Sequence, residues 1–163
     1  MMLNPSGKVT PFLWFDSQAE EAAKFYVSLV PNSRIVDVNY WAKGSPFPEG
    51  SVMSAIFELD GRQYIALNAG PHYKLSPAFS LFVSCEDQAE VDRYWDALVA
   101  DGGAASQCAW LTDKFGVSWQ IVPAAIGELL SSGNAKKSQK VMEAVMQMTK
   151  LDIGKMKQAY GQA

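Results

Sequence analysis

The sequence contains one histidine, His72, and two cysteines, Cys85 and Cys108, among its 163 residues. A metal site built from several histidines therefore cannot be assembled within one chain. Two cysteines are too few for the disulfide framework of a small secreted domain, so both are expected as reduced, half-buried thiols. These absences exclude two broad classes of protein before any motif is considered.

The chain also lacks an excess of positive charge, because its net charge is −3 and its pI is near 5.1. A protein that binds nucleic acid by releasing counterions from phosphates needs a positive surface. Several lysines do gather near the C-terminus, and we interpret them as the solvated face of a helix. They are Lys136, Lys137, Lys140, Lys150, Lys155 and Lys157. We therefore expect no nucleic-acid partner.

Long hydrophobic runs are missing as well, since no apolar segment approaches the roughly 20 residues that a membrane span needs. The first residues, MMLNPSGKVT, lack the basic start and the apolar run of roughly 7–15 residues that define a signal peptide. We therefore expect a cytoplasmic protein with no membrane partner. With 48% apolar and 19% charged residues, the chain can bury a good core as one domain or as two small halves.

The first half of the chain predicts a strand, a helix and three further strands. Pro11 near the start of the first strand favours an edge position, because proline cannot donate to a ladder. Ser17 fits a capping box with Glu20 at the start of the helix. The pair Asp60-Gly61 is a strong hairpin signal, because glycine tolerates the positive φ of the turn. The expected strands span residues 8–15, 34–41, 52–59 and 63–67.

The second half repeats this order with a shorter middle. Gln18-Ala19-Glu20 recurs as Gln88-Ala89-Glu90, and the apolar stripes of the two helices match. After residue 127 the sequence predicts one amphipathic helix and a possible second one, with a methionine-rich stripe that is typical of core or dimer contacts. The expected elements of the second half are a strand at 78–85, a helix at 87–101 and strands at 107–111 and 117–122.

The rest of the chain is expected to pack against the stretch 107–123, QCAWLTDKFGVSWQIVP. A turn signal at Asp113–Gly116 leads there into a short apolar strand that ends at Pro123. Gln120 is a single amide within that strand. The direction of the Gln120 side chain matters. If it faces inward, the residue type at this position decides whether the protein can hold a metal.

Five segments together resemble one family closely: PFLWFDSQAEEA at 11–22, FELDG at 57–61, ALN at 66–68, VSCEDQAEVD at 83–92 and WLTDKFGVSWQIVP at 110–123. The family is the PhnB-like, "3-demethylubiquinone-9 3-methyltransferase" family of the vicinal oxygen chelate (glyoxalase/bleomycin-resistance) superfamily. The resemblance covers nearly the whole chain, including the helical tail.

The resemblance implies an α+β fold, in which two βαβββ modules form a U-shaped mixed sheet around a cavity, usually in a homodimer. The single domain at 1–163 would then comprise a first module at about 8–70, a second at about 77–123 and a C-terminal helical extension at about 124–163. Enzymes of the superfamily hold a divalent metal that polarises the substrate, whereas other members sequester small molecules in the same cavity. Fold alone does not choose between these functions.

The positions that match the metal ligands of the superfamily are approximately Thr10, Ile65, Ser80 and Gln120. None is a histidine or a carboxylate, and neutral hydroxyl and amide groups leave the charge of a divalent cation uncompensated. We therefore expect no metal and no cofactor. The methyltransferase name is not expected to describe this chain either, because the sequence lacks the glycine-rich strand-to-helix turn of the usual S-adenosylmethionine site.

The resemblance and the strand alternation together predict a cavity wall of aromatic rings, hydroxyls and amides. Its expected residues are Thr10, Phe12, Trp14, Asn68, Ser80, Phe82, Trp110, Ser118 and Gln120. Such a wall is typical of a small-ligand pocket, although the filling of a buried core explains it equally well.

The leading hypothesis is a metal-free, homodimeric, small-molecule-binding protein without catalytic residues. The alternative is an enzyme of unknown reaction, with an atypical metal site or with Cys108 or Cys85 as its nucleophile. A purely structural or regulatory dimer is a third class.

Overall fold

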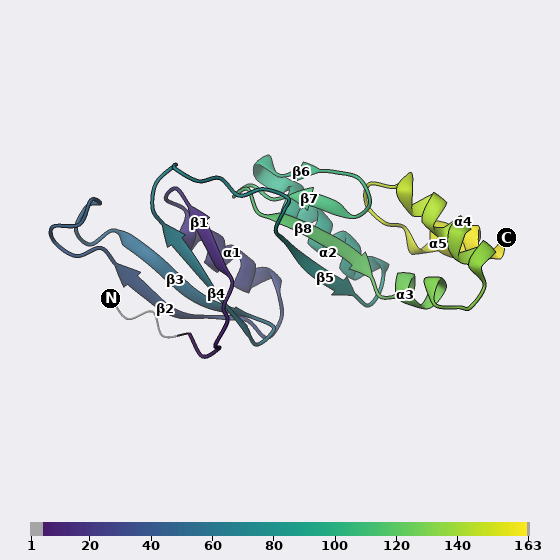
Figure 1. Cartoon of the computed structure of the whole chain (residues 1–163), viewed down its shortest axis with the longest axis horizontal. Helices are drawn as coiled ribbons and strands as arrows, with labels where there is room; N and C mark the ends of the chain where they lie inside the picture. Colours follow the sequence, from purple (N-terminus) through teal and green to yellow (C-terminus); the bar gives the residue numbers. More distant parts are fainter. Residues whose placement is uncertain (1–4, 163) are drawn as a thin grey trace. The chain divides into compact units, whose positions relative to one another are not determined.

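The computed structural model describes residues 5–162, and its chain forms two compact units that adjoin in sequence at Leu75 and Ser76. This boundary lies between the two expected modules. The helical extension belongs to the second unit. Each unit contains a four-stranded mixed sheet with a helix on one face (Figure 1), which confirms the predicted α+β class and its repeated βαβββ order.

The sheet of the first unit has the strand order β1-β4-β3-β2. Its strands are β1 (Phe12–Phe15), β2 (Arg34–Tyr40), β3 (Val52–Leu59) and β4 (Arg62–Asn68), and its helix is α1 (Ala19–Leu29). β1 pairs with β4 in parallel, and the remaining pairs are antiparallel. The β3–β4 turn is the predicted hairpin, with positive φ at Asp60 (46°) and Gly61 (75°).

The first strand starts later than the predicted residue 8. Ladder pairing begins at Phe12, since Pro11 has no N–H and contributes only its carbonyl oxygen, which accepts from the Ile65 N–H at 3.0 Å. The edge position expected from Pro11 is confirmed, because β1 is an outer strand of its sheet.

The capping box expected at Ser17 is wrong. α1 has Gln18 at its N-cap, and that residue makes no side-chain capping bond. The N–H of Ala19 is satisfied instead by Asn68 Oδ1 at 2.8 Å, from the end of β4. A residue 49 positions away in the chain therefore supplies the cap.

The sheet of the second unit has the strand order β5-β8-β7-β6. Its strands are β5 (Ser80–Cys85), β6 (Ala104–Ala105), β7 (Trp110–Thr112) and β8 (Ser118–Pro123). The helix α2 (Gln88–Val99) packs on one face, and the 3-10 turn η1 (Ala100–Gly102) follows it. β6 was not predicted, because two alanines carry no strand signal.

The strand predicted at 107–111 is displaced to Trp110–Thr112. Cys108 and Ala109 adopt positive φ values of 56° and 72°, which interrupt an extended strand. Their N–H groups donate instead to Met148 O and Thr149 O, at 2.9 and 3.0 Å. These two hydrogen bonds connect the C-terminal extension to the segment that precedes β7.

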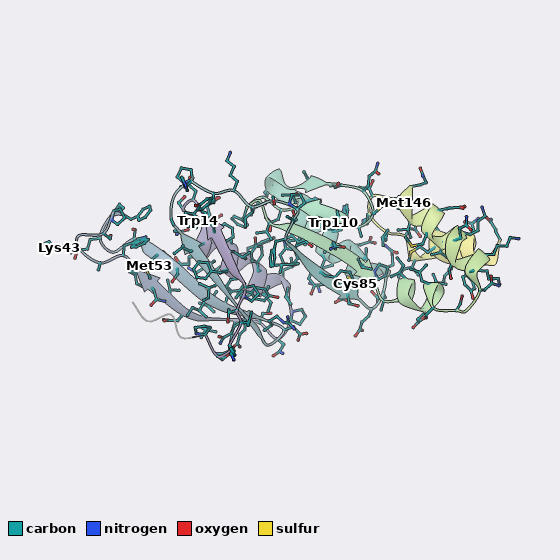
Figure 2. The ribbon with its side chains drawn as sticks, in the orientation of Figure 1. Trp14, Lys43, Met53, Cys85, Trp110 and Met146 are labelled. Carbon is teal, nitrogen blue, oxygen red and sulfur yellow. The ribbon has the colours of Figure 1, made fainter. Side chains whose placement is uncertain are left out.

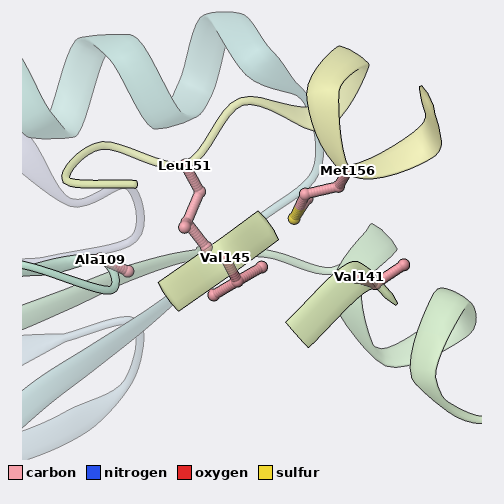
Figure 3. Packing of buried hydrophobic residues seen from close by; sticks show 5 residues of the cluster. All are labelled: Ala109, Val141, Val145, Leu151 and Met156. Atoms are coloured by element: carbon pink, nitrogen blue, oxygen red, sulfur yellow. The ribbon is translucent and has the colours of Figure 1, made fainter. Parts of the chain in front are cut away.

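The extension consists of α3 (Ala125–Leu130), α4 (Ala135–Met146) and α5 (Ile153–Gly161). α3 was not predicted, whereas the two later helices were expected. Together with Ala109 they form a small core, whose buried residues Ala109, Val141, Val145, Leu151 and Met156 are drawn in Figure 3. Gln88 of α2 ties the extension further, because it donates to Leu151 O at 3.0 Å and accepts from the Ile153 N–H at 2.9 Å.

Among residues 5–162, no helix is both long and apolar enough to span a bilayer.

Candidate functional site

In each unit, one face of the sheet packs on the helix, and the opposite face is not covered by that helix. We call the latter the open face. In the second unit, Leu81 and Trp119 are paired across β5 and β8 and are buried on the α2 side. Because neighbours along a strand alternate between faces, Ser80, Phe82 and Gln120 belong to the open face.

Strand register brings Phe82, Gln120 and Trp110 into one row on this open face. Phe82 is the Cα partner of Gln120 on one side, and Trp110 is its partner on the other. Figure 2 shows Trp110 on the second sheet. The Phe82 side chain is 60% exposed, although a phenyl ring gains by burial. An amide thus lies between two aromatic rings, one of which is largely open to solvent.

A row of hydroxyl groups lies beside that row. Ser80 pairs with Ser118, and Ser118 pairs with Thr112. Gln120 Nε2 donates to Ser80 Oγ at 3.0 Å, so one amide donor is engaged and the side chain is held in place. Thr112 was not among the expected site residues, although the alternation of Trp110, Leu111 and Thr112 would have placed it on this face.

The open face of the first unit carries two further predicted residues, Phe12 and Trp14. Leu13 between them is buried on the α1 side. Phe12 is 48% exposed. The Trp14 indole donates to Gly70 O at 2.9 Å and lies edge-on to Tyr73, with ring centroids 5.0 Å apart. Trp14 is therefore fixed in orientation by its surroundings.

Two residues expected in the cavity have other roles. Asn68 is buried on the α1 side, where Oδ1 caps α1 and Nδ2 donates to Val52 O at 3.1 Å. Thr10 lies before β1 and lines a shallow hollow of about 380 Å³ beside the β3–β4 turn, with Arg62 and Gln63. Asn68 thus lies on the helix side of the sheet by strand parity, and Thr10 lies outside the ladder, which begins at Phe12. Whether either residue contacts a ligand stays a prediction.

The residues at the four expected metal positions do not fit a divalent cation. Thr10 offers only a neutral hydroxyl, which lies 3.5 Å from Gly7 O, and Ile65 offers no donor atom and is buried. Ser80 and Gln120 are bonded to each other through neutral groups. Within residues 5–162, no three histidine, cysteine, aspartate or glutamate side chains come close enough to hold an ion. The donor set lacks the imidazole or carboxylate that such ions require.

The contacts of the two cysteines and of His72 can be described within their own units. Cys85 is fully buried at the end of β5, and burial, assisted by the nearby Glu90 carboxylate, raises the pKa of its thiol to about 12. Cys108 is partly exposed, and its thiol lies 3.9 Å from the Met146 sulfur. His72 belongs to the first unit, with its ring edge-on to Tyr73. None of these contacts supplies a base to a thiol.

This difference between the thiols predicts their reactivity. With a pKa of about 12, only about one Cys85 thiol in 10⁵ is ionised at pH 7, and the side chain is also shielded from reagent. Iodoacetamide at neutral pH should therefore modify Cys108 alone, as read by peptide mass spectrometry. In denaturant both should react at similar rates. Modification of Cys85 in the folded protein would contradict the burial described.

A hollow of about 840 Å³ lies where α2, α3 and the start of α5 meet in the second unit. Its lining mixes carboxylates with lysines. Lys150 is bonded to Asp92 at 2.9 Å and lies 3.4 Å from Asp96, while Asp87 and Asp152 cap their own helices. The ion pairs of Lys150 with Asp92 and Asp96 join the extension to α2, and we do not assign a ligand site to this hollow.

The remaining carboxylate of interest is Asp113, in the turn before β8. It is 3% exposed and accepts from the backbone N–H groups of Phe115 and Val117 at 2.8 and 3.0 Å, and from the Trp119 indole at 2.8 Å. The turn was predictable from the sequence, but this hydrogen-bond network was not. The network holds β8, and thereby Gln120, in position.

Comparison with known proteins agrees with this architecture. A family model described as 3-demethylubiquinone-9 3-methyltransferase matches residues 7–122. The structure of a PhnB protein from Bacillus cereus is 36% identical, with a TM-score of 0.66, over 72% of this chain and 100% of that one. The structure of Pseudomonas aeruginosa protein PA1353 is 22% identical, with a TM-score of 0.59, over 72% and 98%.

No curated protein matches the chain. The family match ends at residue 122, so the expected resemblance through the helical tail is wrong: α3, α4 and α5 lie beyond it. The matched residues include both open faces and the whole βαβββ repeat. The chain therefore belongs to the PhnB-like, 3-demethylubiquinone-9 3-methyltransferase family.

Proposed function

We propose that this protein binds a small molecule without a metal ion, and that the ligand lies on the open face of the second sheet. The observation that carries the proposal is the register of Gln120 between Phe82 and Trp110. Aromatic rings provide a large apolar contact area, and a fixed amide between them provides direction. A ligand with an aromatic or apolar body and a polar substituent matches this arrangement.

In the adjacent row, Ser80 and Thr112 flank the buried Ser118 and add hydroxyl groups next to the amide. A hydroxyl can donate and accept, and an amide carries two donors and one acceptor. None of these groups carries a charge. The site therefore favours an uncharged polar substituent over a carboxylate or an ammonium group.

The absence of suitable metal ligands among the matched positions supports a binding function over the metal-dependent chemistry of the superfamily. Ser80 and Gln120 are neutral and bonded to each other, and Ile65 has no donor atom. Elemental analysis of protein purified without added metal or chelator tests this point. Stoichiometric zinc, iron, manganese or nickel would favour the alternative, an enzyme with an atypical metal site.

The methyltransferase activity in the family's name is left out of the proposal on physical grounds. The usual S-adenosylmethionine site needs an open parallel sheet and a glycine-rich turn after its first strand. Both sheets here are mixed, and the turn from β1 to α1 is Asp16-Ser17-Gln18. The corresponding turn before α2 is Glu86-Asp87, which is acidic and likewise without glycine. Methyl transfer is therefore not part of the proposed function.

The binding site can be tested by titrating ¹⁵N-labelled protein with benzamide, phenol and cyclohexanone. We expect saturable shift changes at Phe82, Trp110 and Gln120 with at least one probe. Phe82→Ala should remove a stacking partner, and Gln120→Leu should remove the amide while keeping its volume. Each should weaken binding about fivefold or more, which corresponds to about 1 kcal/mol.

Phe79→Ala is the matched control for Phe82→Ala. Phe79 is an exposed phenylalanine immediately before β5, outside the paired rows of the open face. Its removal should leave the affinity unchanged. Equal loss in both variants, or no saturable shift with any of the three probes, would rule out this site.

The homodimer and the cytoplasmic location expected from the sequence stay predictions. Sedimentation equilibrium of the purified chain would decide the first, and the same measurement on Phe82→Ala would show whether the open face takes part in self-association.

A further inference from the structure

Two sulfur atoms lie close together where the helical extension is bonded to the segment before β7. The Cys108 thiol lies 3.9 Å from the Met146 thioether, although the two residues are 38 positions apart in the chain. Met146 is the last residue of α4 (Figure 2). Because the family match ends at residue 122, one of the two sulfur atoms comes from a part of the chain beyond that match.

The structure leaves two methionines of α4 outside the core, although the sequence predicts core or dimer contacts for them. Val141 and Val145 are buried and form the face of α4 that packs within the extension. Met142 and Met146 each follow one of these valines and are 40% and 56% exposed. Packing within the extension therefore does not account for two long, flexible thioethers on the neighbouring face of the helix.

Met142 brings a third sulfur atom to the same side of α4 as Met146. Residues four apart on a helix are neighbours, with Cβ atoms about 5–6 Å apart. Helical side chains lean toward the N-terminus of their helix, so the Met146 side chain leans toward Met142. One thiol and two thioethers, from two separate segments of the second unit, thus gather at one place.

The backbone holds Cys108 and the end of α4 together. The Cys108 N–H donates to Met148 O at 2.9 Å, and the Met148 N–H donates to Val145 O at 3.0 Å. The turn that follows Met146 is therefore the same turn that bonds Cys108. A site formed by these two residues requires little ordering when an ion binds, which favours affinity.

The distance between the two sulfur atoms fits a shared metal ion. Sulfur ligands bond a metal at about 2.3 Å, so two of them in a trigonal arrangement lie about 4 Å apart. The 3.9 Å between Cys108 Sγ and Met146 Sδ agrees with this separation. An ion between them would leave both side chains near their present positions.

The chemistry of the three ligands selects the ion. Thiolate and thioether sulfur atoms are soft ligands, and Cu(I) is a soft ion that accepts both. One thiolate also neutralises a monovalent ion completely, so the site needs neither a carboxylate nor an imidazole. A divalent ion would keep an uncompensated charge here, as it would at Ser80 and Gln120.

We propose that Cys108, Met142 and Met146 form a binding site for one Cu(I) ion, with one thiolate and two thioethers as its three ligands. The Cys108 thiol proton passes to the solvent as the copper–sulfur bond forms, and the copper stays Cu(I) throughout. The site uses no residue of the open faces and does not rest on the small-molecule site around Gln120.

Cu(I) itself is the probe, added without oxygen to the purified chain in competition with bicinchoninate, whose Cu(I) complex is coloured. One ion should bind per chain. Cys108→Ser, Met142→Leu and Met146→Leu should each weaken binding about tenfold or more, since even outer-shell partners of a metal contribute that much. Unchanged affinity in either methionine variant would reduce the site to an ordinary thiol and overturn the proposal. One ion per two chains would also contradict it.

Met156→Leu is the matched control, because Met156 belongs to the same extension and is fully buried in its core. Exchange of methionine for leucine conserves volume, so the extension should stay folded in all three leucine variants. The Cu(I) affinity of Met156→Leu should equal that of the unsubstituted chain. Equal losses in Met156→Leu and Met146→Leu would show that a disturbed extension, and not a lost ligand, weakens binding.

Ag(I), a soft monovalent ion that air does not oxidise, gives a second readout. With ¹³C-labelled methionine methyl groups, one equivalent should shift the Met142 and Met146 signals and leave those of the buried Met53 and Met156 in place. The same equivalent should protect Cys108 from iodoacetamide. An unchanged rate of Cys108 modification would contradict the proposed site.

Discussion

Replacing Asp113 by asparagine is expected to lower the free energy of unfolding by about 2–3 kcal/mol. The carboxylate accepts from the N–H groups of Phe115 and Val117 through Oδ1 and from the Trp119 indole through Oδ2. An asparagine has only one acceptor oxygen, so its NH₂ group must face at least one of these donors. A buried donor then loses its partner in a site that is 3% exposed.

Urea unfolding followed by tryptophan fluorescence measures this loss, and Asp101→Asn is the matched control. Asp101 lies in the same unit, is 78% exposed at its side chain and approaches Lys114 at 3.7 Å. A surface ion pair of this kind contributes about 0–1 kcal/mol. Asparagine also tolerates the positive φ of 56° at this position. Similar small losses in both variants would show that the Asp113 network does not hold the turn.

Replacing Gly103 by alanine is expected to cost about 3 kcal/mol, because no room exists for a methyl group. A Cβ at this position would approach the Leu98 carbonyl oxygen, and it would lie 2.7 Å from Val99 Cα and 2.9 Å from the Val99 carbonyl carbon. All three atoms are backbone at the end of α2, so a side-chain rotation cannot relieve the overlap. The chain must shift where it passes from η1 into β6.

Gly127→Ala is the corresponding control, since Gly127 lies in α3 and a Cβ there meets nothing within 4 Å. Alanine should stabilise this helix by about 0.5–1 kcal/mol relative to glycine. Urea unfolding of both variants gives the comparison. A Gly103→Ala protein as stable as the unsubstituted chain would contradict the packing at the end of α2.

The neighbouring glycines Gly102 and Gly103 are required for two different physical reasons. Gly102 and Gly103 together predict a helix stop, and α2 does end there. Gly102 has a φ of 113°, which favours glycine through backbone freedom. Gly103 has an ordinary φ of −67° and is required through lack of space. Only the folded structure separates these two reasons.

The order of the elements was predictable because its causes are local. Apolar periodicity distinguishes helices from strands, and Asp60-Gly61 specifies its hairpin by backbone preference. The internal repeat followed from residues that recur, such as Gln18-Ala19-Glu20. Element ends were less predictable, since Pro11 shortened β1 and the positive φ of Cys108 and Ala109 displaced β7.

Five of the nine expected cavity residues lie in the two rows of the second open face, and strand alternation explains why. Residues two positions apart along a strand lie on the same face, and this alone groups the five residues. They are Ser80, Phe82, Ser118, Gln120 and Trp110. Asn68 lies on the α1 side and Thr10 lies outside the β1 ladder. Alternation within one strand does not show which face the helix covers or where the strand begins.

The sequence by itself determined that this chain repeats a βαβββ unit and that its matched metal positions carry no imidazole or carboxylate, because these are properties of residue identity and spacing. The tertiary structure alone decided which residues meet: Asn68 with the first turn of α1, Asp113 with the Trp119 indole, Gln120 with Ser80, and Asn39 with Ser54. Two of these pairs, Asn68 with α1 and Gln120 with Ser80, are separated by 40 residues or more. Their contact depends on the register between strands, which no local pattern specifies.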